Sequence, residues 1–194
     1  MTVARTKERR TVILRAAEKL FAAHGFHGTD VEGIAREAGT AKGTVYNYFE
    51  NKDDIFLSVL EEGFRKLEGR MRMGLSKIKD PVEKIRKGIG IYIYFLADHL
   101  HLFRILAGEQ MQFEDKIKKM KREEFFARVG HIERAISAGI KEGRLKKIDP
   151  FVASSSLFGM INFTVFRGLL IGKKFSAKRL SEQISGLYLE GMLP

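Results

Sequence analysis

A short stretch between residues 42 and 52 gathers side chains that can donate hydrogen bonds or meet a phosphate group. Lysines supply positive charge, and hydroxyl and amide groups lie between them. The set consists of Lys42, Thr44, Tyr46, Asn47, Tyr48 and Lys52. The amide of Asn47 could pair with the edge of adenine or touch only the backbone of a nucleic acid. Donors that point outward from an apolar base are typical of a DNA-reading surface.

Residues with catalytic or metal-binding potential are sparse elsewhere. The sequence contains no G-x-S-x-G, P-loop, H-E-x-x-H or dinucleotide-binding pattern. His99 and His101 are two positions apart, a spacing that does not put both on one helical face, and no third ligand is evident. We therefore expect no catalytic residues, no metal and no cofactor, and an enzyme is improbable.

The spacing of small and apolar residues predicts how the polar stretch is held. Ala35, Gly39 and Val45 lie at offsets of four and ten, which is the internal spacing of a helix-turn-helix. Gly39 can adopt the left-handed conformation that a tight turn requires. Thr29 and Glu32 have the T-x-x-E spacing of a capping box, so we expect Thr29 to begin the first helix of the motif. We expect Thr40 to cap the second, at residues 41–48.

The remaining sequence predicts further helices and no strand. A helix at residues 6–24 has an apolar face, and Asn51 begins another that runs to about residue 75, leaving Lys52 free to reach outward. Asp80-Pro81, Asp149-Pro150 and Ser176 have the form of helix starts. They begin helices near residues 81–99, 150–171 and 177–192, with segments 100–113 and 115–142 between them. We predict an all-α chain of about nine helices, with domains at 1–50 and 51–194.

Composition limits the class of protein further. The chain has 194 residues, 44% apolar and 30% charged, which are values of a globular protein. The absence of cysteine fits a cytoplasmic location. Residues 1–50 carry eight basic and six acidic side chains, whereas residues 51–194 carry 27 and 18, so +9 of the net charge of +11 lies in the second segment. Basicity alone is therefore weak support for DNA binding.

Four motifs in the first sixty residues resemble the TetR family of bacterial transcriptional regulators. They are Gly25-Phe26-x-Gly28-Thr29, Ile34-Ala35-x-x-Ala38-Gly39, Gly43-x-Val45-Tyr46-x-Tyr48-Phe49 and Lys52. The resemblance implies a homodimer, joined through the last two long helices at about 151–171 and 177–192. It also implies a palindromic DNA operator as partner and release of that operator by a small-molecule effector.

The resemblance also assigns DNA-contacting positions. Lys42, Gly43, Thr44 and Tyr46 correspond to positions that meet base edges or nearby phosphates, whereas Thr29, Tyr48 and Lys52 correspond to positions that hold the phosphate backbone. Asn47 falls at a variable position. The alternatives are that the two lysines are solvated surface residues and that the tyrosines close the small core. The basic residues Arg5, Lys7, Arg9 and Arg10 could follow a phosphate strand or form an unstructured tail.

Aromatic and polar side chains of the second segment are candidates for an effector pocket. The candidates are Tyr92, Phe95, His99, Phe103, Arg104, Met111, Phe158, Asn162, Phe163 and Phe166. Large pockets between helices are lined in this way, although many such aromatic residues are ordinary core and Asn162 could instead lie at a dimer contact. The positive charge of this segment would suit an amphipathic anion such as an acyl thioester. A sequence-nonspecific architectural DNA-binding protein is the alternative function.

Overall fold

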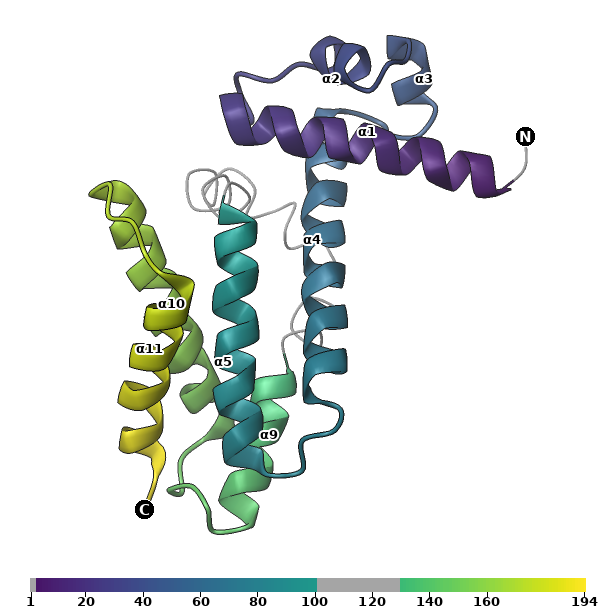
Figure 1. The fold of residues 1–194 in the computed structure, drawn as a ribbon. Helices are drawn as coiled ribbons and strands as arrows, with labels where there is room; N and C mark the ends of the chain where they lie inside the picture. Colours follow the sequence, from purple (N-terminus) through teal and green to yellow (C-terminus); the bar gives the residue numbers. More distant parts are fainter. Residues whose placement is uncertain (1–2, 101–129) are drawn as a thin grey trace. The chain divides into compact units, whose positions relative to one another are not determined.

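The structure is a computed structural model that describes residues 3–100 and 130–194, and the described part is entirely helical (Figure 1). Its helices are α1 (Val3–His24), α2 (Val31–Glu37), α3 (Lys42–Tyr46), α4 (Lys52–Leu75), α5 (Pro81–Asp98), α9 (His131–Lys141), α10 (Pro150–Leu170) and α11 (Ala177–Met192). The predicted all-α class is confirmed, and eight helices in the described residues are close to the expected nine. The segment predicted at 100–113 and most of that at 115–142 lie outside the described residues.

The described residues form two compact units. One comprises residues 3–64 with Leu100, and the other comprises residues 65–99 and 130–194. Helix α4 contributes its first half to one unit and its second half to the other. The predicted domains, 1–50 and 51–194, stay predictions.

The first unit is built around an apolar cluster that α1, α2, α3 and the first half of α4 share. The largest side chains in it are Phe21, Phe26 and Phe56, whose rings lie 5.3–5.8 Å apart. Helices α2 and α3 lie together on one side of α1 (Figure 1). The inward positions predicted for the helix-turn-helix, Ala35 and Val45, are both buried. Gly39 has a φ of 62°, which confirms the predicted left-handed turn.

Two predicted helix caps of this unit are wrong. The cap of α2 is Asp30, whose Oδ1 accepts a hydrogen bond from the Gly33 amide at 2.6 Å. The Thr29 hydroxyl instead donates backward to the Gly25 carbonyl at 2.8 Å, because Gly25 turns the chain with a φ of 71°. Helix α3 begins after Ala41 with no side-chain cap, rather than after Thr40. The predicted caps Asn51, Asp80, Asp149 and Ser176 are confirmed.

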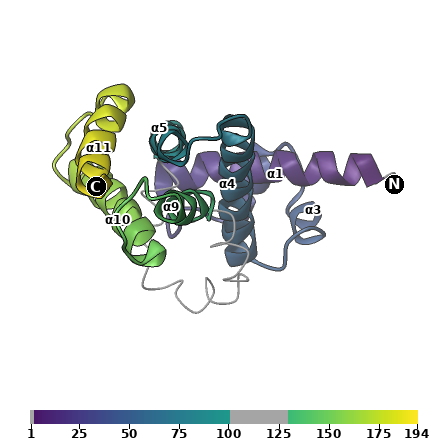
Figure 2. The same ribbon diagram turned by 90° about the horizontal axis from the view of Figure 1, so that it is seen from below.

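The second unit packs α5 against α11 and α9, and α9 against α10 (Figure 2). Isoleucines dominate its interior: Ile85, Ile89 and Ile93 on α5 are buried, as are Ile132 and Ile136 on α9, and the two helices are in contact. Gly88 lets the two helices approach closely: a Cβ there would lie 2.1 Å from Ile132 Cδ1. Dense packing of branched side chains makes this unit a defined core.

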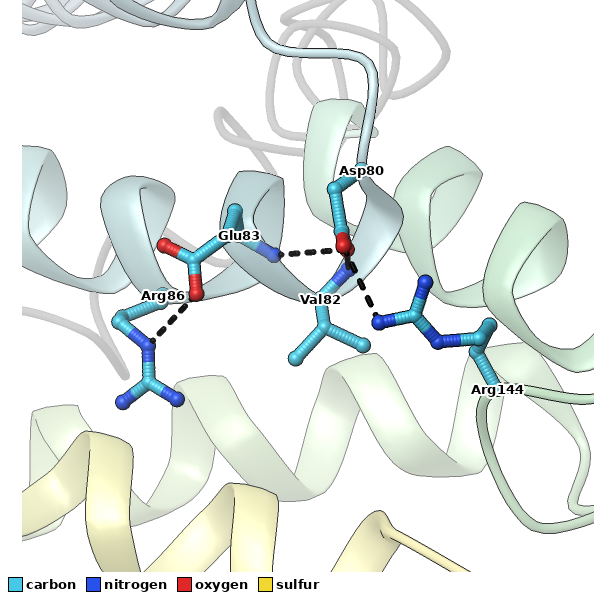
Figure 3. Close-up of polar contacts among 5 residues, drawn as sticks. All are labelled: Asp80, Val82, Glu83, Arg86 and Arg144. Atoms are coloured by element: carbon cyan, nitrogen blue, oxygen red, sulfur yellow. Dashed lines mark hydrogen bonds and ion pairs between the residues drawn. The ribbon is translucent and has the colours of Figure 1, made fainter.

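Asp80 joins the start of α5 to the segment that follows α9 (Figure 3). Its Oδ1 accepts hydrogen bonds from the amides of Val82 at 2.8 Å and Glu83 at 3.3 Å. Its Oδ2 accepts a hydrogen bond from Arg144 Nη2 at 3.1 Å. The Glu83 amide, followed by the Val82 amide and Arg144, holds the pKa of Asp80 below its ordinary value, against an opposing effect of desolvation.

Replacing Asp80 with asparagine tests this junction. Asparagine keeps an oxygen that can cap α5 but removes the charge that Arg144 meets. A carboxyl whose pKa is lowered by folding stabilises the native state above its unfolded pKa of about 3.9, and this contribution is lost as the pH falls through the folded pKa. We expect Asp80→Asn to melt a few degrees lower than the unchanged protein near neutral pH, and the two melting temperatures to converge near about pH 2.

Thermal unfolding followed by circular dichroism across this pH range checks the expectation. The control is Glu83→Gln, because Glu83 pairs with Arg86 at 3.2 Å on an exposed surface where ion pairs contribute little. If the melting temperatures of Asp80→Asn and the unchanged protein differ by the same amount down to low pH, the charge of Asp80 does not have this role.

Candidate nucleic-acid interface and effector site

Helix α3 presents most of the predicted DNA-binding residues on one exposed surface. Lys42, Gly43 and Asn47 are exposed, Tyr46 is 48% exposed, and Thr44 is half-buried. They come together because α3 and its C-cap Asn47 span only six positions. Gly43 leaves the backbone open, since a Cβ at this position would meet nothing within 4 Å. The surface could therefore approach a phosphate backbone or a base edge closely.

The opposite side of α3 is apolar and buried. Val45 is fully buried and Phe49 nearly so, and Tyr48 is half-buried against the same cluster. Of the two tyrosines that could close the small core, Tyr48 packs partly against it, whereas Tyr46 is exposed. Lys42 forms an ion pair with Glu32 at 3.8 Å on the exposed surface, and such a pair adds little stability and leaves Lys42 able to bind an anion.

Thr29 and Lys52 are placed differently from the other predicted DNA contacts. Thr29 is 3% exposed, with its hydroxyl bonded to Gly25. The prediction that Lys52 is free to reach outward is wrong. Its Nζ donates to the carbonyl oxygens of Phe26 and Thr29, each at 2.9 Å. That Thr29 and Lys52 bind phosphate stays a prediction.

The N-terminal basic residues lie on α1 rather than in a tail. Lys7 and Arg9 are exposed. Arg10 is half-buried: its Nη2 donates to Ser58 Oγ at 3.0 Å, and its guanidinium lies 5.2 Å from the centre of the Phe49 ring. Sequence reasoning missed this link, because its partners lie 39 and 48 positions away in the chain.

Three of the predicted effector-binding residues meet between α5 and α10. The Tyr92 hydroxyl donates to Asn162 Oδ1 at 2.8 Å, and the Tyr92 and Phe158 rings meet edge to face at 5.2 Å. Burial raises the pKa of Tyr92 to about 12, with the Asn162 hydrogen bond acting against the rise. Tyr92 is therefore an uncharged phenol at physiological pH, and the site offers two neutral polar groups beside aromatic carbon.

A second pair of predicted residues meets at the end of α5. The rings of Phe95 and His99 stack at 4.3 Å, and His99 Nδ1 lies 3.0 Å from the Phe95 carbonyl oxygen. The Arg70 guanidinium lies 5.6 Å from the centre of the Phe95 ring and 2.8 Å from Asp98 Oδ2. The polar and aromatic groups of these side chains are therefore paired within this cluster.

Of the remaining predicted effector residues, two are described by the structure and three are not. Phe163 is 66% exposed and points away from the interior of the unit, whereas Phe166 is half-buried. Phe103, Arg104 and Met111 lie outside the described residues. The assignment of these five residues to an effector pocket stays a prediction.

Sequence reasoning missed an open groove of about 530 Å³ between α4, α5 and α11. Lys87, Gly90 and Tyr94 line it on α5, on the opposite face of the helix from Tyr92. Its arginines, Arg70 and Arg86, are each paired with a carboxylate. The signal was present as polar and small residues at helical spacing, but it did not distinguish a groove from an ordinary solvated face.

Exposed apolar side chains collect on the last two long helices. They are Phe151, Val152, Phe163 and Leu170 on α10, Ile171 at its end, and Leu187 on α11. Several large apolar side chains left in water on neighbouring helices are typical of an interaction surface.

Among the residues that the structure describes, no group of three or more histidine, aspartate or glutamate side chains could hold a metal ion. None of the described helices is both long enough and apolar enough to cross a membrane.

Comparison with known proteins assigns both parts of the chain. Residues 13–59 match the family "Bacterial regulatory proteins, tetR family", and residues 79–166 match "Tetracyclin repressor-like, C-terminal domain". The chain is 28% identical over 181 residues to a fatty acid metabolism regulator protein of Bacillus subtilis, and 93% of each chain is covered.

Solved structures share the same arrangement of helices. The Bacillus subtilis transcriptional regulator FadR in complex with stearoyl-CoA is 27% identical with a TM-score of 0.82, covering 93% of this chain and 98% of that one. The fatty acid degradation regulator FadR of Bacillus halodurans, at 24% identity and a TM-score of 0.82, covers 94% and 95% and supports the fold. Together with the exposed polar surface of α3, these matches show that the chain belongs to the TetR family of bacterial transcriptional regulators, which are ligand-responsive DNA-binding proteins.

Proposed function

We propose that this chain is a homodimeric repressor that binds a palindromic DNA operator in the cytoplasm and leaves it when an acyl thioester occupies the second unit. The observation that carries the proposal is α3: a recognition helix with donors exposed on one side and Val45 buried on the other. A helix of this kind can lie in the major groove, and two copies can read two half-sites one helical turn apart.

The proposed DNA surface consists of Lys42, Gly43, Thr44, Tyr46, Asn47 and Tyr48. Lys42 supplies charge for phosphate, and Asn47 has the amide that pairs with adenine. The modest charge of residues 1–50 makes this surface important, since a few placed groups must provide recognition that the general charge does not. A sequence-nonspecific architectural protein would not need an ordered recognition helix, so this alternative is not favoured.

Binding to selected DNA tests the proposed surface. We expect selection from random duplexes to recover one palindromic sequence, bound far more tightly than a scrambled duplex of the same composition. Lys42→Met should weaken binding to both duplexes and reduce the slope of log affinity against log salt by about 0.9 for each phosphate that the variant no longer neutralises.

The matched control is Lys87→Met, which removes a lysine from α5 in the second unit and should leave the affinity and the salt slope unchanged. Fluorescence anisotropy at several salt concentrations measures both quantities. Recovery of no preferred sequence, with binding that depends on salt alone, would instead support an architectural protein.

The proposed effector follows from the chemistry of the second unit. Tyr92, Asn162 and Phe158 offer neutral hydrogen bonding beside aromatic carbon, which suits a thioester carbonyl and the first carbons of an acyl chain. The charge of +9 on residues 51–194 suits a phosphorylated head group. A regulator 27% identical to this chain has been solved with stearoyl-CoA, which supports the same ligand class here.

Stearoyl-CoA is the probe for this proposal, with coenzyme A and stearate as separate controls. We expect stearoyl-CoA to bind, to raise the melting temperature and to release the selected duplex. Tyr92→Phe removes the hydroxyl that donates to Asn162, so we expect stearoyl-CoA to bind about fivefold more weakly while DNA affinity without ligand stays unchanged.

Tyr94→Phe is the matched control, because Tyr94 lies two positions away on the other face of α5 and is 47% exposed. Calorimetry gives the affinities. If both variants weaken stearoyl-CoA binding equally, Tyr92 does not belong to the proposed site. If stearoyl-CoA does not bind the unchanged protein, the effector is not an acyl thioester.

The proposed dimer uses α10 and α11. Leu187 and Phe163 expose apolar area on these helices that a second copy would cover. Leu187→Glu would place an unpaired charge in that contact, so we expect the dimer dissociation constant to rise at least about 100-fold.

Met73→Glu serves as the control, because Met73 on α4 is even more exposed, at 73%, and lies outside the proposed interface. Light scattering after size-exclusion chromatography distinguishes monomer from dimer. A Leu187→Glu protein that remains dimeric while Met73→Glu dissociates would move the interface away from α11.

A further inference from the structure

Lys52, the first residue of α4, is fastened inside the first unit rather than displayed on its surface. Its ammonium donates to two backbone carbonyl oxygens, those of Phe26 and Thr29, at 2.9 Å each. The same nitrogen lies 4.3 Å from the centre of the Phe26 ring. An ammonium has three hydrogens, so two of its three donors and one side of its charge are already engaged.

The two carbonyl oxygens belong to a turn whose shape is fixed independently. Gly25 begins it with a φ of 71°, and the Thr29 hydroxyl closes back onto the Gly25 carbonyl at 2.8 Å. Gly28 cannot be replaced without distortion, because a Cβ there would lie 2.3 Å from the His24 carbonyl oxygen. The two carbonyl oxygens of this turn therefore form a binding site for one cation.

This turn leads directly into the DNA-reading motif. Asp30 follows Thr29 and caps α2, and α2 passes through the Gly39 turn into α3. The Lys52 bonds therefore tie the first turn of α4 to the entry of α2, across 23 and 26 positions of sequence. Directed hydrogen bonds constrain orientation more than the apolar packing that also joins these segments.

Lys42 shows what a cation free to meet phosphate looks like in the same unit. Its side chain is 53% exposed, and the carboxylate with which it pairs is itself exposed and lies 3.8 Å away. A phosphate could reach only the third donor of Lys52 unless it replaced a carbonyl bond that is already made. The two lysines therefore have different roles.

We infer that Lys52 is a positioning residue for DNA recognition: its ammonium joins the start of α4 to the Phe26 and Thr29 carbonyl oxygens and so fixes how α2 and α3 are presented. The inference rests on the proposed DNA-reading function of α3. It assigns Lys52 an effect on specificity through geometry, instead of a direct contact with the phosphate backbone.

The first test needs no DNA and no substitution. In the full-length ¹⁵N,¹³C-labelled protein, we expect the Lys52 ammonium to exchange slowly with water and to show scalar couplings across its hydrogen bonds to the Phe26 and Thr29 carbonyl carbons. Lys42 should show neither signal. A rapidly exchanging Lys52 ammonium without these couplings overturns the inference, whatever DNA binding shows.

The second test separates positioning from phosphate contact through salt dependence. With the selected duplex, we expect Lys52→Met to lower affinity by about 10-fold to 100-fold, the range that loss of charged hydrogen bonds implies. Binding to the scrambled duplex should change little, and the salt slope should stay that of the unchanged protein. Lys42→Met, by contrast, should lower the slope by about 0.9 for each phosphate that Lys42 neutralises and should weaken both duplexes.

A Lys52→Met protein whose salt slope falls as that of Lys42→Met does, with both duplexes weakened equally, would make Lys52 a phosphate contact and overturn the inference. Unchanged affinity for the selected duplex would overturn it as well. If the variant fails to fold, the couplings of the Lys52 ammonium are measured again in the complex of the unchanged protein with the selected duplex. Retained couplings to the two carbonyl carbons support positioning. Couplings to phosphorus in their place refute it. If selection recovers no preferred duplex, the proposed function fails, and couplings present in the free protein would then be a separate result.

Discussion

Helix α3 depends on the burial of apolar side chains at and just after its end. Five residues are far too few for a helix to be stable alone in water, because nucleation costs more than so few hydrogen bonds return. What holds α3 is the burial of Val45 and Phe49 in the cluster formed by α1, α2 and the start of α4. Exposed donors such as Tyr46 and Asn47 keep their places only because this apolar base is fixed. The proposed DNA-binding surface is thus a consequence of core packing.

Local signals in the sequence were enough to place most elements. The caps Asp80, Asp149 and Ser176 fall where the sequence predicts them, because capping depends on a side chain and on amides two or three positions away. Ile55, Val59 and Leu67 of α4 are buried, and their separations of four and eight positions are the helical periodicity that a sequence displays directly. In such cases the determining contacts are within one or two helical turns.

The errors arose where tertiary geometry competed with a local pattern. Thr29 has the spacing of a capping box, yet the left-handed turn at Gly25 offers its hydroxyl a carbonyl on the other side, and Asp30 takes the capping role. Lys52 is a residue type that is usually exposed, but its partners are backbone oxygen atoms 23 and 26 positions away. Backbone acceptors carry no side-chain signature, so no inspection of residue types would have found them. The meeting of Tyr92 and Asn162, 70 positions apart, was likewise beyond the pattern that nominated both residues.

The continuity of α4 determines how the two proposed sites can be coupled. Helix α4 is unbroken from Lys52 to Leu75, so no loop separates its first turn from Leu67, Met71 and Leu75, which pack with Phe95 of α5. Tyr92 packs against the same cluster, and an effector at Tyr92 would therefore act on side chains of the helix that begins with Lys52. A ligand shifts an equilibrium only by its differential affinity for the two conformers, and a 100-fold preference corresponds to about 2.7 kcal/mol. Within the first unit, the Lys52 bonds to Phe26 and Thr29 link the first turn of α4 to the entry of α2, so a change at that turn would reach the proposed DNA-binding helix through these bonds.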